Sequence, residues 1–186
     1  MEEFLISRRY LLFSLVNLRV AHIGDLDLIY QTVLEDAAKG HYAEMYCSNH
    51  QARAGLQVNL KKMIETEVRV HTKIENNQLI NKNIFSRVIV LEKSKKPIGF
   101  CIVSRADDPK DLEIWMFSIF RDFRNKGYGQ KLLKKLLKSI RKTYPTIEIV
   151  ARCFENSKIM ISILENNNFI EEKSSYEARF FRLKFS

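Results

Sequence analysis

The chain has 186 residues, of which 46% are hydrophobic and 28% charged, proportions that are ordinary for a globular protein. This length predicts one domain with a sizeable hydrophobic core. Lysine and arginine number 31 against 22 aspartates and glutamates, and the resulting net charge of +9 favours an anionic partner: a phosphate-bearing cofactor, nucleic acid or an acidic protein.

The cysteines, histidines and apolar runs exclude several classes of protein. Cys47, Cys101 and Cys153 are too few and too far apart for a disulfide framework or a Cys-x-x-Cys metal pair, so we expect a reducing, cytoplasmic compartment. The four histidines match no metal-binding pattern, and no metal is expected. The chain starts with acidic residues and has no long apolar run, which predicts neither a signal peptide nor a transmembrane helix.

The first half of the chain is predicted to contain a strand and two helices. Residues 1–15 fit no single element and are treated as an N-terminal extension. Periodicity and capping residues then predict a strand at Val16–Ala21, a helix starting near Asp25, an irregular aromatic-rich stretch at His41–Ser48, a mostly polar helix at Gln51–Val70 and a loop at Asn76–Asn83.

Three β-rich runs follow, separated by short polar turns. The third run, Leu112–Phe120, is apolar on both faces and is therefore predicted to be a central strand. Short turns between consecutive strands predict antiparallel pairing. The other two strands are expected at Ser86–Glu92 and Pro97–Arg105, with turns at Lys93–Lys96 and Asp107–Lys110.

The segment after the central strand has the features of an anion site. Arg121–Gly129 is a basic turn, and Gln130–Arg141 is a helix with leucines on one stripe and lysines on another. Unpaired amides in the first helical turn and the helix dipole favour a negative group there. Because Gly127 and Gly129 carry no Cβ, a phosphate can approach the backbone closely, and a pyrophosphate is the favoured ligand.

The last third of the chain is predicted to close the sheet. Tyr144-Pro145 ends the basic helix, and an asparagine near Phe169 can take the left-handed position that ends the next one. The elements expected are a strand at Thr146–Cys153, a helix capped by Asn156 or Ser157 and ended by Asn166–Asn168, and strands at Ile170–Lys173 and Ala178–Phe185.

Arg124–Gly129 fits the pattern Q/R-x-x-G-x-G/A, which in this strand-to-helix context resembles the GNAT superfamily of N-acetyltransferases. The glycine spacing and the absence of Gly-Lys-Ser/Thr disfavour Rossmann and P-loop sites. The order of elements resembles the GNAT fold from Val16 to Phe185. The resemblance implies an α+β (mixed α/β) fold, with a mostly antiparallel twisted sheet of about six to seven strands and about four helices, in one domain at residues 16–186.

The resemblance also implies acetyl-CoA as cosubstrate. The pantetheine arm would bind the backbone of the central strand, where the Phe117 amide is a candidate oxyanion donor, and the pyrophosphate would bind the turn. Lys131 or Lys134 could reach the 3′-phosphate, although a lysine stripe is usually a solvated face. The implied cofactor-binding residues are Phe117, Ser118, Ile119, Arg124, Asn125, Lys126, Gly127, Tyr128, Gly129, Gln130 and Asn156.

Glu113 is the candidate general base, because it lies fourteen residues before Gly127, as a glutamate does in several GNAT protein acetyltransferases. The alternative is that Glu113 simply ends a hairpin beside Asp111. Many GNAT enzymes carry a tyrosine in the last helix that protonates the leaving thiolate, and Leu164 stands in that place here. Possible substitutes are Tyr144, Tyr176, Ser162 and Cys153.

The resulting hypothesis is an acetyl-CoA-dependent N-acetyltransferase that acts on a primary amine of a small molecule or protein by direct transfer in a ternary complex. By resemblance, the candidate acceptor contacts are Tyr42, Glu44, Tyr46 and His50. Two alternatives stay open: a non-catalytic CoA-binding sensor or interaction module, and a basic acetyltransferase associated with RNA. The acceptor is not identified by the sequence. A homodimer through the closing strands is also expected, with no membrane partner.

Overall fold

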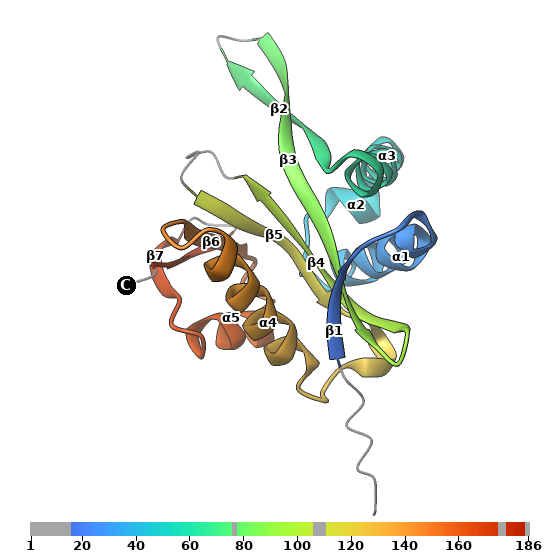
Figure 1. The fold of residues 1–186 in the computed structure, drawn as a ribbon. Coiled ribbons are helices and arrows are strands. Elements are labelled where there is room, and N and C mark those ends of the chain that lie inside the picture. The colour runs from blue at the N-terminus through green and yellow to red at the C-terminus, as the bar shows by residue number, and fades with distance from the viewer. Residues whose placement is uncertain (1–15, 76–77, 106–110, 175–177, 185–186) are drawn as a thin grey trace, which may run out of the picture.

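A computed structural model describes residues 16–75, 78–105, 111–174 and 178–184, which form a mixed α+β fold (Figure 1). In these residues, helices and strands follow one another in an order close to the expected one, with two short 3₁₀ turns at Ile23–Asp25 and Arg121–Phe123. The elements are β1 (Val16–Val20), α1 (Leu26–Ala37), α2 (Met45–Ser48), α3 (His50–Thr66), β2 (Val68–Glu75), β3 (Gln78–Lys93), β4 (Lys96–Arg105), β5 (Asp111–Ile119), α4 (Tyr128–Thr143), β6 (Glu148–Cys153), α5 (Lys158–Glu165), β7 (Ile170–Ser174) and β8 (Arg179–Leu183).

The strands form one sheet in the order β1-β3-β4-β5-β6-β8-β7, and β2 pairs with β3 beside this path. Every pair is antiparallel except β5 with β6. The mostly antiparallel sheet is therefore confirmed. Its eight strands in the described residues exceed the expected six to seven, because β2 was not foreseen.

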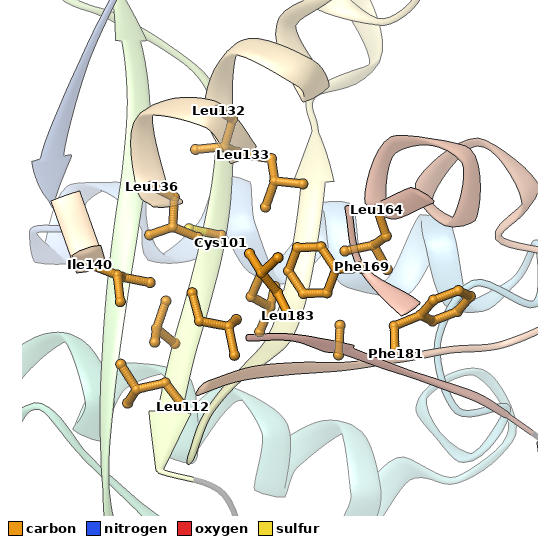
Figure 2. Close-up of a cluster of buried hydrophobic side chains, with 14 of the residues drawn as sticks. Cys101, Leu112, Leu132, Leu133, Leu136, Ile140, Leu164, Phe169, Phe181 and Leu183 are labelled. Atoms are coloured by element: carbon orange, nitrogen blue, oxygen red, sulfur yellow. The ribbon is translucent and has the colours of Figure 1, made fainter. Parts of the chain in front are cut away.

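One hydrophobic core joins α4 and α5 to the sheet (Figure 2). The leucine stripe of α4 faces this core, as its helical periodicity predicts, and the lysines of the same helix face solvent. Phe169, Phe181 and Leu183 close the core from the C-terminal strands and the turn before them. The aliphatic side chains that α4 and α5 bury in this core are Leu132, Leu133, Leu136, Ile140, Ile161 and Leu164.

A second core joins α1 and α3 to the opposite face of the sheet, through Ile29, Val33, Leu60 and Met63. The strand β4 contributes to both cores in alternation. Phe100 and Ile102 belong to the second core, and Cys101 and Val103 belong to the first. This burial on both faces explains why Pro97–Arg105 is an almost continuous apolar run rather than an alternating one.

The structure corrects two predictions in the region before β3. The polar helix predicted to reach Val70 ends at Thr66, where Glu67 adopts a left-handed conformation (φ 56°). The β-branched residues Val68 and Val70 then lie in β2 instead.

Within the predicted loop Asn76–Asn83, residues 78–83 are strand, because β3 starts at Gln78 and pairs with β2. Residues 76–77 lie outside the described part. The β2–β3 hairpin projects beyond the rest of the sheet (Figure 1). Its polar composition misled the prediction because a projecting hairpin has no core to bury: Leu79 at its outer end is 74% exposed.

The other turns agree with their local chemistry. Ser94 and Lys95 both have positive φ in the tight turn between β3 and β4, and Asn168 (φ 64°) takes the left-handed position after α5. The predicted turn Asp107–Lys110 lies outside the described residues, as does the N-terminal extension. In the described part of the chain, no helix is both long and apolar enough to cross a membrane.

Candidate active site

The strands β5 and β6 pair along their first halves and then separate. In these strands, Asp111–Ile114 of β5 pair in parallel with Glu148–Ala151 of β6, and the pairing stops there. At the same point the register of β5 against β4 shifts, so that Trp115 is an extra residue in β5. Because a β-bulge bends the strand that contains it, the second half of β5 turns away from β6.

The separation opens into a cavity of about 740 Å³. Its walls are residues 113–119 of β5, 151–153 of β6 with Phe154 after them, 41–43 after α1, and parts of the basic turn and α5. All of the predicted catalytic and cofactor-binding residues line this cavity, with the exception of Lys126. Residues that are far apart in the chain are thus brought to one place.

The basic turn presents the start of α4 to this cavity. Asn125 and Gly127 both have left-handed backbone conformations, with φ of 59° and 72°. Lys131 donates the first backbone hydrogen bond of the helix to the Gly127 carbonyl (3.2 Å), so the amides of residues 128–130 have no acceptor within the helix. No heavy atom beyond the adjacent residues lies within 4 Å of a Cβ built on Gly127, which leaves space for an anion.

The second motif glycine has a different role, because it allows α5 to approach α4. A Cβ on Gly129 would lie 2.8 Å from Cδ1 of Ile163. Beside this contact, the Asn167 side-chain amide donates to the Gln130 side-chain carbonyl at 2.8 Å. Gly129 and Gln130 therefore join the two helices that border the cavity.

The side chain of Arg124 points inward rather than toward a ligand at the turn. Its Nη2 donates to both carboxylate oxygens of Asp36 (2.8 and 2.9 Å), and its Nε donates to the Ile119 carbonyl (2.7 Å). Its backbone amide donates to the Arg121 carbonyl (3.2 Å). Arg124 thus fastens the turn to α1 and β5. The Lys126 ammonium donates to the Asp122 carbonyl (2.8 Å).

Positive charge gathers around Tyr128, the first residue of α4. The Lys93 ammonium donates to the Tyr128 hydroxyl at 2.8 Å, and this hydrogen bond lowers the pKa of Tyr128. Lys131 lies over the same ring, 5.3 Å from its centroid. These contacts indicate a cationic environment at the helix start, which favours a phosphate group.

The backbone of β5 at the cavity is contacted by Tyr42, from the loop after α1. The Phe117 amide donates to the Tyr42 hydroxyl oxygen at 3.1 Å, and this oxygen also lies 3.0 Å from the Phe117 carbonyl and 2.8 Å from Ser118 Oγ. Ser118 in turn donates to Asp36 at 2.8 Å. Burial raises the pKa of Tyr42 well above its ordinary value, so its hydroxyl stays protonated.

Glu113 lies in the sheet with a buried side chain and lines the cavity. Its Oε1 accepts a 2.6 Å hydrogen bond from Nε of Arg152 on β6, whose side chain is 46% exposed. Since Glu113 is the third residue of β5 and pairs with Ser104 and Val150 on its two neighbours, it lies within the sheet and faces the cavity.

Leu164 is completely buried in the first core, away from the cavity lining. Of its possible substitutes, Cys153 lines the cavity, whereas Tyr144 and Ser162 do not. Tyr176 lies outside the described residues. Burial raises the pKa of Cys153 to about 12, which keeps the thiol protonated near neutral pH.

The loop after α1 reaches across the separation to the start of α5. The hydroxyl of Ser157 lies 3.3 Å from Nδ1 of His41, and a Cβ on Gly40 would lie 2.5 Å from the Asn156 side-chain nitrogen. Of the candidate acceptor contacts, Tyr42 and Tyr46 line the cavity. Glu44 and His50 are exposed and do not line it.

Sequence reasoning missed three residues of this site: Asp36, Trp115 and Arg152. Asp36 could have been found, because it is an acidic residue on the buried stripe of α1 beside Val33 and Ala37. No local signal marks Trp115 as a bulge or Arg152 as a partner of Glu113. In the residues that the structure describes, no cluster of three or more histidine, cysteine, aspartate or glutamate side chains could hold a metal ion.

Comparison with known proteins identifies the same fold. Residues 59–168, more than half of the chain, match the Acetyltransferase (GNAT) family. The PaiA N-acetyltransferase from Thermoplasma acidophilum, solved with coenzyme A, has a TM-score of 0.65 and 13% identity, over 92% of this chain and 99% of that one. No curated protein matches the chain.

Two further similar structures differ in their acceptors. Spermidine N-acetyltransferase from Vibrio cholerae, with CoA and spermine, has a TM-score of 0.64 and 15% identity, over 91% of this chain and 95% of that one. A Salmonella typhimurium acetyltransferase that modifies the N-terminal serine of ribosomal protein L7/L12 has a TM-score of 0.63 and 14% identity, over 92% of this chain and 95% of that one. With the family match and the separated β5 and β6, these likenesses lead to one conclusion: the chain belongs to the GNAT family of acetyltransferases.

Proposed function

We propose that this protein is an acetyl-CoA-dependent N-acetyltransferase that transfers an acetyl group directly to a primary amine in a ternary complex. The observation that carries the proposal is that one cavity joins the open edge of β5 to the N-terminus of α4. This arrangement fits a ligand with an extended amide-containing arm and a pyrophosphate at one end.

In this proposal the amides from Asn125 to Gln130 hold the phosphates, and Gly127 provides the open approach. The backbone of Phe117–Ile119 borders the acyl-bearing arm, and Asn156 flanks it from the start of α5. The Arg124 side chain acts indirectly, by holding the turn against Asp36. Acetyl-CoA, when bound, supplies an activated acyl group.

Glu113 is the proposed general base for the attacking amine. It lines the cavity on the strand that borders the acyl-bearing arm, and Arg152 holds its orientation. Direct transfer is favoured over an acyl-cysteine intermediate, because the buried Cys153 thiol has a pKa of about 12 and stays protonated. A thiol in that state is a poor nucleophile.

The acceptor is proposed only as a class, a primary amine on a small molecule or a protein. The two acceptor types of the similar structures, a polyamine and a protein N-terminus, span both halves of this class. We place the reaction in the cytoplasm, since all three cysteines are free thiols.

The test uses acetyl-CoA with a labelled acetyl group and a cell lysate separated into small-molecule, protein and RNA fractions. Label that appears in one fraction, only when the protein is present, establishes transfer and identifies the acceptor class. If acetyl-CoA binds but no fraction is labelled, the second candidate is favoured: a non-catalytic CoA-binding sensor or interaction module. Leu164, in the place of the family's tyrosine, is the observation that favours this candidate.

A third candidate, an RNA-associated acetyltransferase, is favoured by the outer face of α4. Lys131, Lys134, Lys135 and Lys138 are exposed there, and none forms an ion pair with a described residue. The helix contains no acidic residue. If four lysines contact single-stranded RNA, the slope of log K against log salt should be about −3.

The control for this candidate keeps the net charge equal. Replacement of Lys134, Lys135 and Lys138 by glutamine should flatten the slope, whereas the same change at Lys39, Lys61 and Lys184 should leave it intact. A wild-type affinity for RNA that does not depend on salt would rule the RNA surface out.

A homodimer through β7, whose Ile170 is 72% exposed, is also proposed and is tested by sedimentation.

A further inference from the structure

The Tyr42 hydroxyl forms a junction between the loop after α1 and the open edge of β5. Its oxygen accepts the Phe117 amide (3.1 Å), although the two residues are 75 positions apart in the chain. It also contacts the Phe117 carbonyl at 3.0 Å and Ser118 Oγ at 2.8 Å. A single hydroxyl therefore occupies both backbone groups of Phe117 that a neighbouring strand or an amide-containing ligand would pair with.

The donor and the acceptor of each hydrogen bond in this network can be assigned. Asp36 accepts two hydrogen bonds from Arg124 (2.8 and 2.9 Å), and its carboxylate is the acceptor of this network. Ser118 gives its one hydroxyl proton to Asp36 (2.8 Å), which leaves Ser118 Oγ as an acceptor toward Tyr42. The Tyr42 proton therefore points to the Phe117 carbonyl (3.0 Å) or to Ser118 Oγ (2.8 Å), and a ligand oxygen in the cavity would compete with these two acceptors for it, while the Tyr42 oxygen still accepts from the Phe117 amide.

This arrangement changes which group faces the cavity. The Phe117 amide, implied by family resemblance to be the oxyanion donor, donates its hydrogen bond to the Tyr42 oxygen instead. Tyr42 itself lines the cavity and is polarised by that amide. Its high pKa keeps the donor proton in place at neutral pH.

We propose that the Tyr42 hydroxyl, backed by the Phe117 amide, is the hydrogen-bond donor to the carbonyl oxygen of the acetyl thioester. This inference rests on the proposed function. In the transfer, the amine nitrogen bonds to the carbonyl carbon, and the C–O π electrons move to the oxygen that Tyr42 stabilises. When the carbonyl re-forms, the C–S bond breaks and its electron pair leaves with sulfur as thiolate. The amine proton passes to Glu113, and Tyr42 keeps its own.

A hydroxyl that donates without releasing its proton suits the thiolate pathway, in which sulfur leaves as an anion. Removal of one oxyanion donor typically lowers turnover about 10²–10³-fold. Tyr42→Phe removes only the oxygen and keeps the ring that packs against the second core.

The first readout needs no acceptor. Infrared difference spectra are recorded with acetyl-CoA carrying ¹³C at the thioester carbonyl, bound to wild type, to Tyr42→Phe and to the control Tyr30→Phe. A hydrogen bond from Tyr42 lowers the carbonyl stretching frequency in wild type and in Tyr30→Phe, and the frequency rises in Tyr42→Phe. An equal frequency in all three proteins would overturn the proposal.

The second readout separates catalysis from folding and binding. We expect Tyr42→Phe to lower kcat about 10²–10³-fold with the Kd for acetyl-CoA close to that of wild type, and to lower the Tm because the Phe117 amide loses its acceptor. A parallel loss of Tm and affinity would show a merely structural latch, and tighter binding would show that Tyr42 blocks the cleft. Failure of wild type to acetylate any amine would instead count against the proposed function, while the infrared result still decides the Tyr42 contact.

Discussion

Gly127 joins the basic turn to α4 with a left-handed backbone (φ 72°) and open space where a Cβ would lie. These two properties separate the conformational role of the residue from its role toward a ligand. Asparagine and aspartate both tolerate the left-handed region, but only aspartate adds a charge. The two variants Gly127→Asn and Gly127→Asp, compared with each other, therefore test the anion site without changing the turn.

We expect Gly127→Asp to weaken acetyl-CoA binding at least about tenfold relative to Gly127→Asn, because like charges a few ångströms apart repel by several kcal/mol at moderate dielectric. Isothermal titration calorimetry at low salt measures both Kd values. Equal Kd values for the two variants would contradict a phosphate at this helix start.

Glu113 is a buried carboxylate whose orientation is fixed by a hydrogen bond from Arg152, and it is the proposed general base. Glu113→Gln keeps the size of the side chain but cannot accept a proton from the amine. We expect kcat to fall about 10²–10⁴-fold with the Kd for acetyl-CoA unchanged, as measured by steady-state kinetics and calorimetry. Glu35→Gln, an exposed change on α1, is the control. Full activity in Glu113→Gln would assign the residue to the structure of the sheet alone.

Asp25, at the start of α1, provides a pH-dependent contribution to stability. Burial alone would raise the pKa of Asp25, but hydrogen bonds from Arg19 (2.7 and 2.9 Å) and from the His22 amide (2.9 Å) outweigh it and lower the pKa. A carboxyl group with a depressed folded-state pKa stabilises the fold above its unfolded value of about 4, and this stability is lost as pH falls through the folded value.

Asp25→Asn should therefore destabilise the protein at pH 7, and the difference from wild type should shrink as the pH falls below about 4. Urea unfolding across this pH range measures the effect. Asp27→Asn changes an exposed residue two positions further along the chain, and it should show little of this pH-dependent loss of stability. A difference that is constant with pH would mean that the Asp25 charge is not the source.

At the scale of elements, α4 packs on the sheet through one face and presents its N-terminus to the cavity. Its leucine face anchors it on the sheet, and its N-terminus is thereby held at the cavity. Leu136 is 1% exposed in the first core, so Leu136→Ala should cost about 2–5 kcal/mol of unfolding free energy.

Chemical denaturation measures this loss, with Lys138→Ala on the solvent face as a control that should change stability by less than about 0.5 kcal/mol. A Leu136→Ala loss as small as that of the control would mean that α4 is not anchored by its leucines. Because the helix N-terminus depends on this anchor, affinity for acetyl-CoA should also fall in the leucine variant.

For the whole molecule, the cavity lies where the sheet is interrupted. Among the strand pairs that the structure describes, β5–β6 is the one parallel pair, and it joins only four residue pairs. A ligand that fills the gap should therefore link the half of the protein with α1 and α3 to the half with β6, α5 and the closing strands.

Acetyl-CoA at one hundred times its Kd should add about 2.7 kcal/mol of stability. For a chain of this size, that corresponds to a Tm increase of roughly 5–10 °C, as measured by differential scanning calorimetry. Hydrogen exchange should show protection in both β5 and β6. No Tm increase at saturating ligand would contradict a site between these strands.

Several features of this protein were determined by the sequence alone. The order of most strands and helices, the amphipathic face of α4 and a left-handed asparagine shortly before Phe169 were all predicted correctly. They depend on side chains within a few residues of one another, through periodicity, capping and the absence of Cβ. The family-specific turn at Arg124–Gly129 belongs to the same group.

Only the tertiary structure decided the contacts that give the site its chemistry. Arg124 reaches Asp36 across 88 positions, Tyr42 meets Phe117 across 75, and Arg152 meets Glu113 across 39. The bulge at Trp115 and the β2–β3 hairpin also depend on distant partners. Local propensity says nothing about such pairs, because the free energy of each contact arises only when folding removes water and brings both groups to the same place.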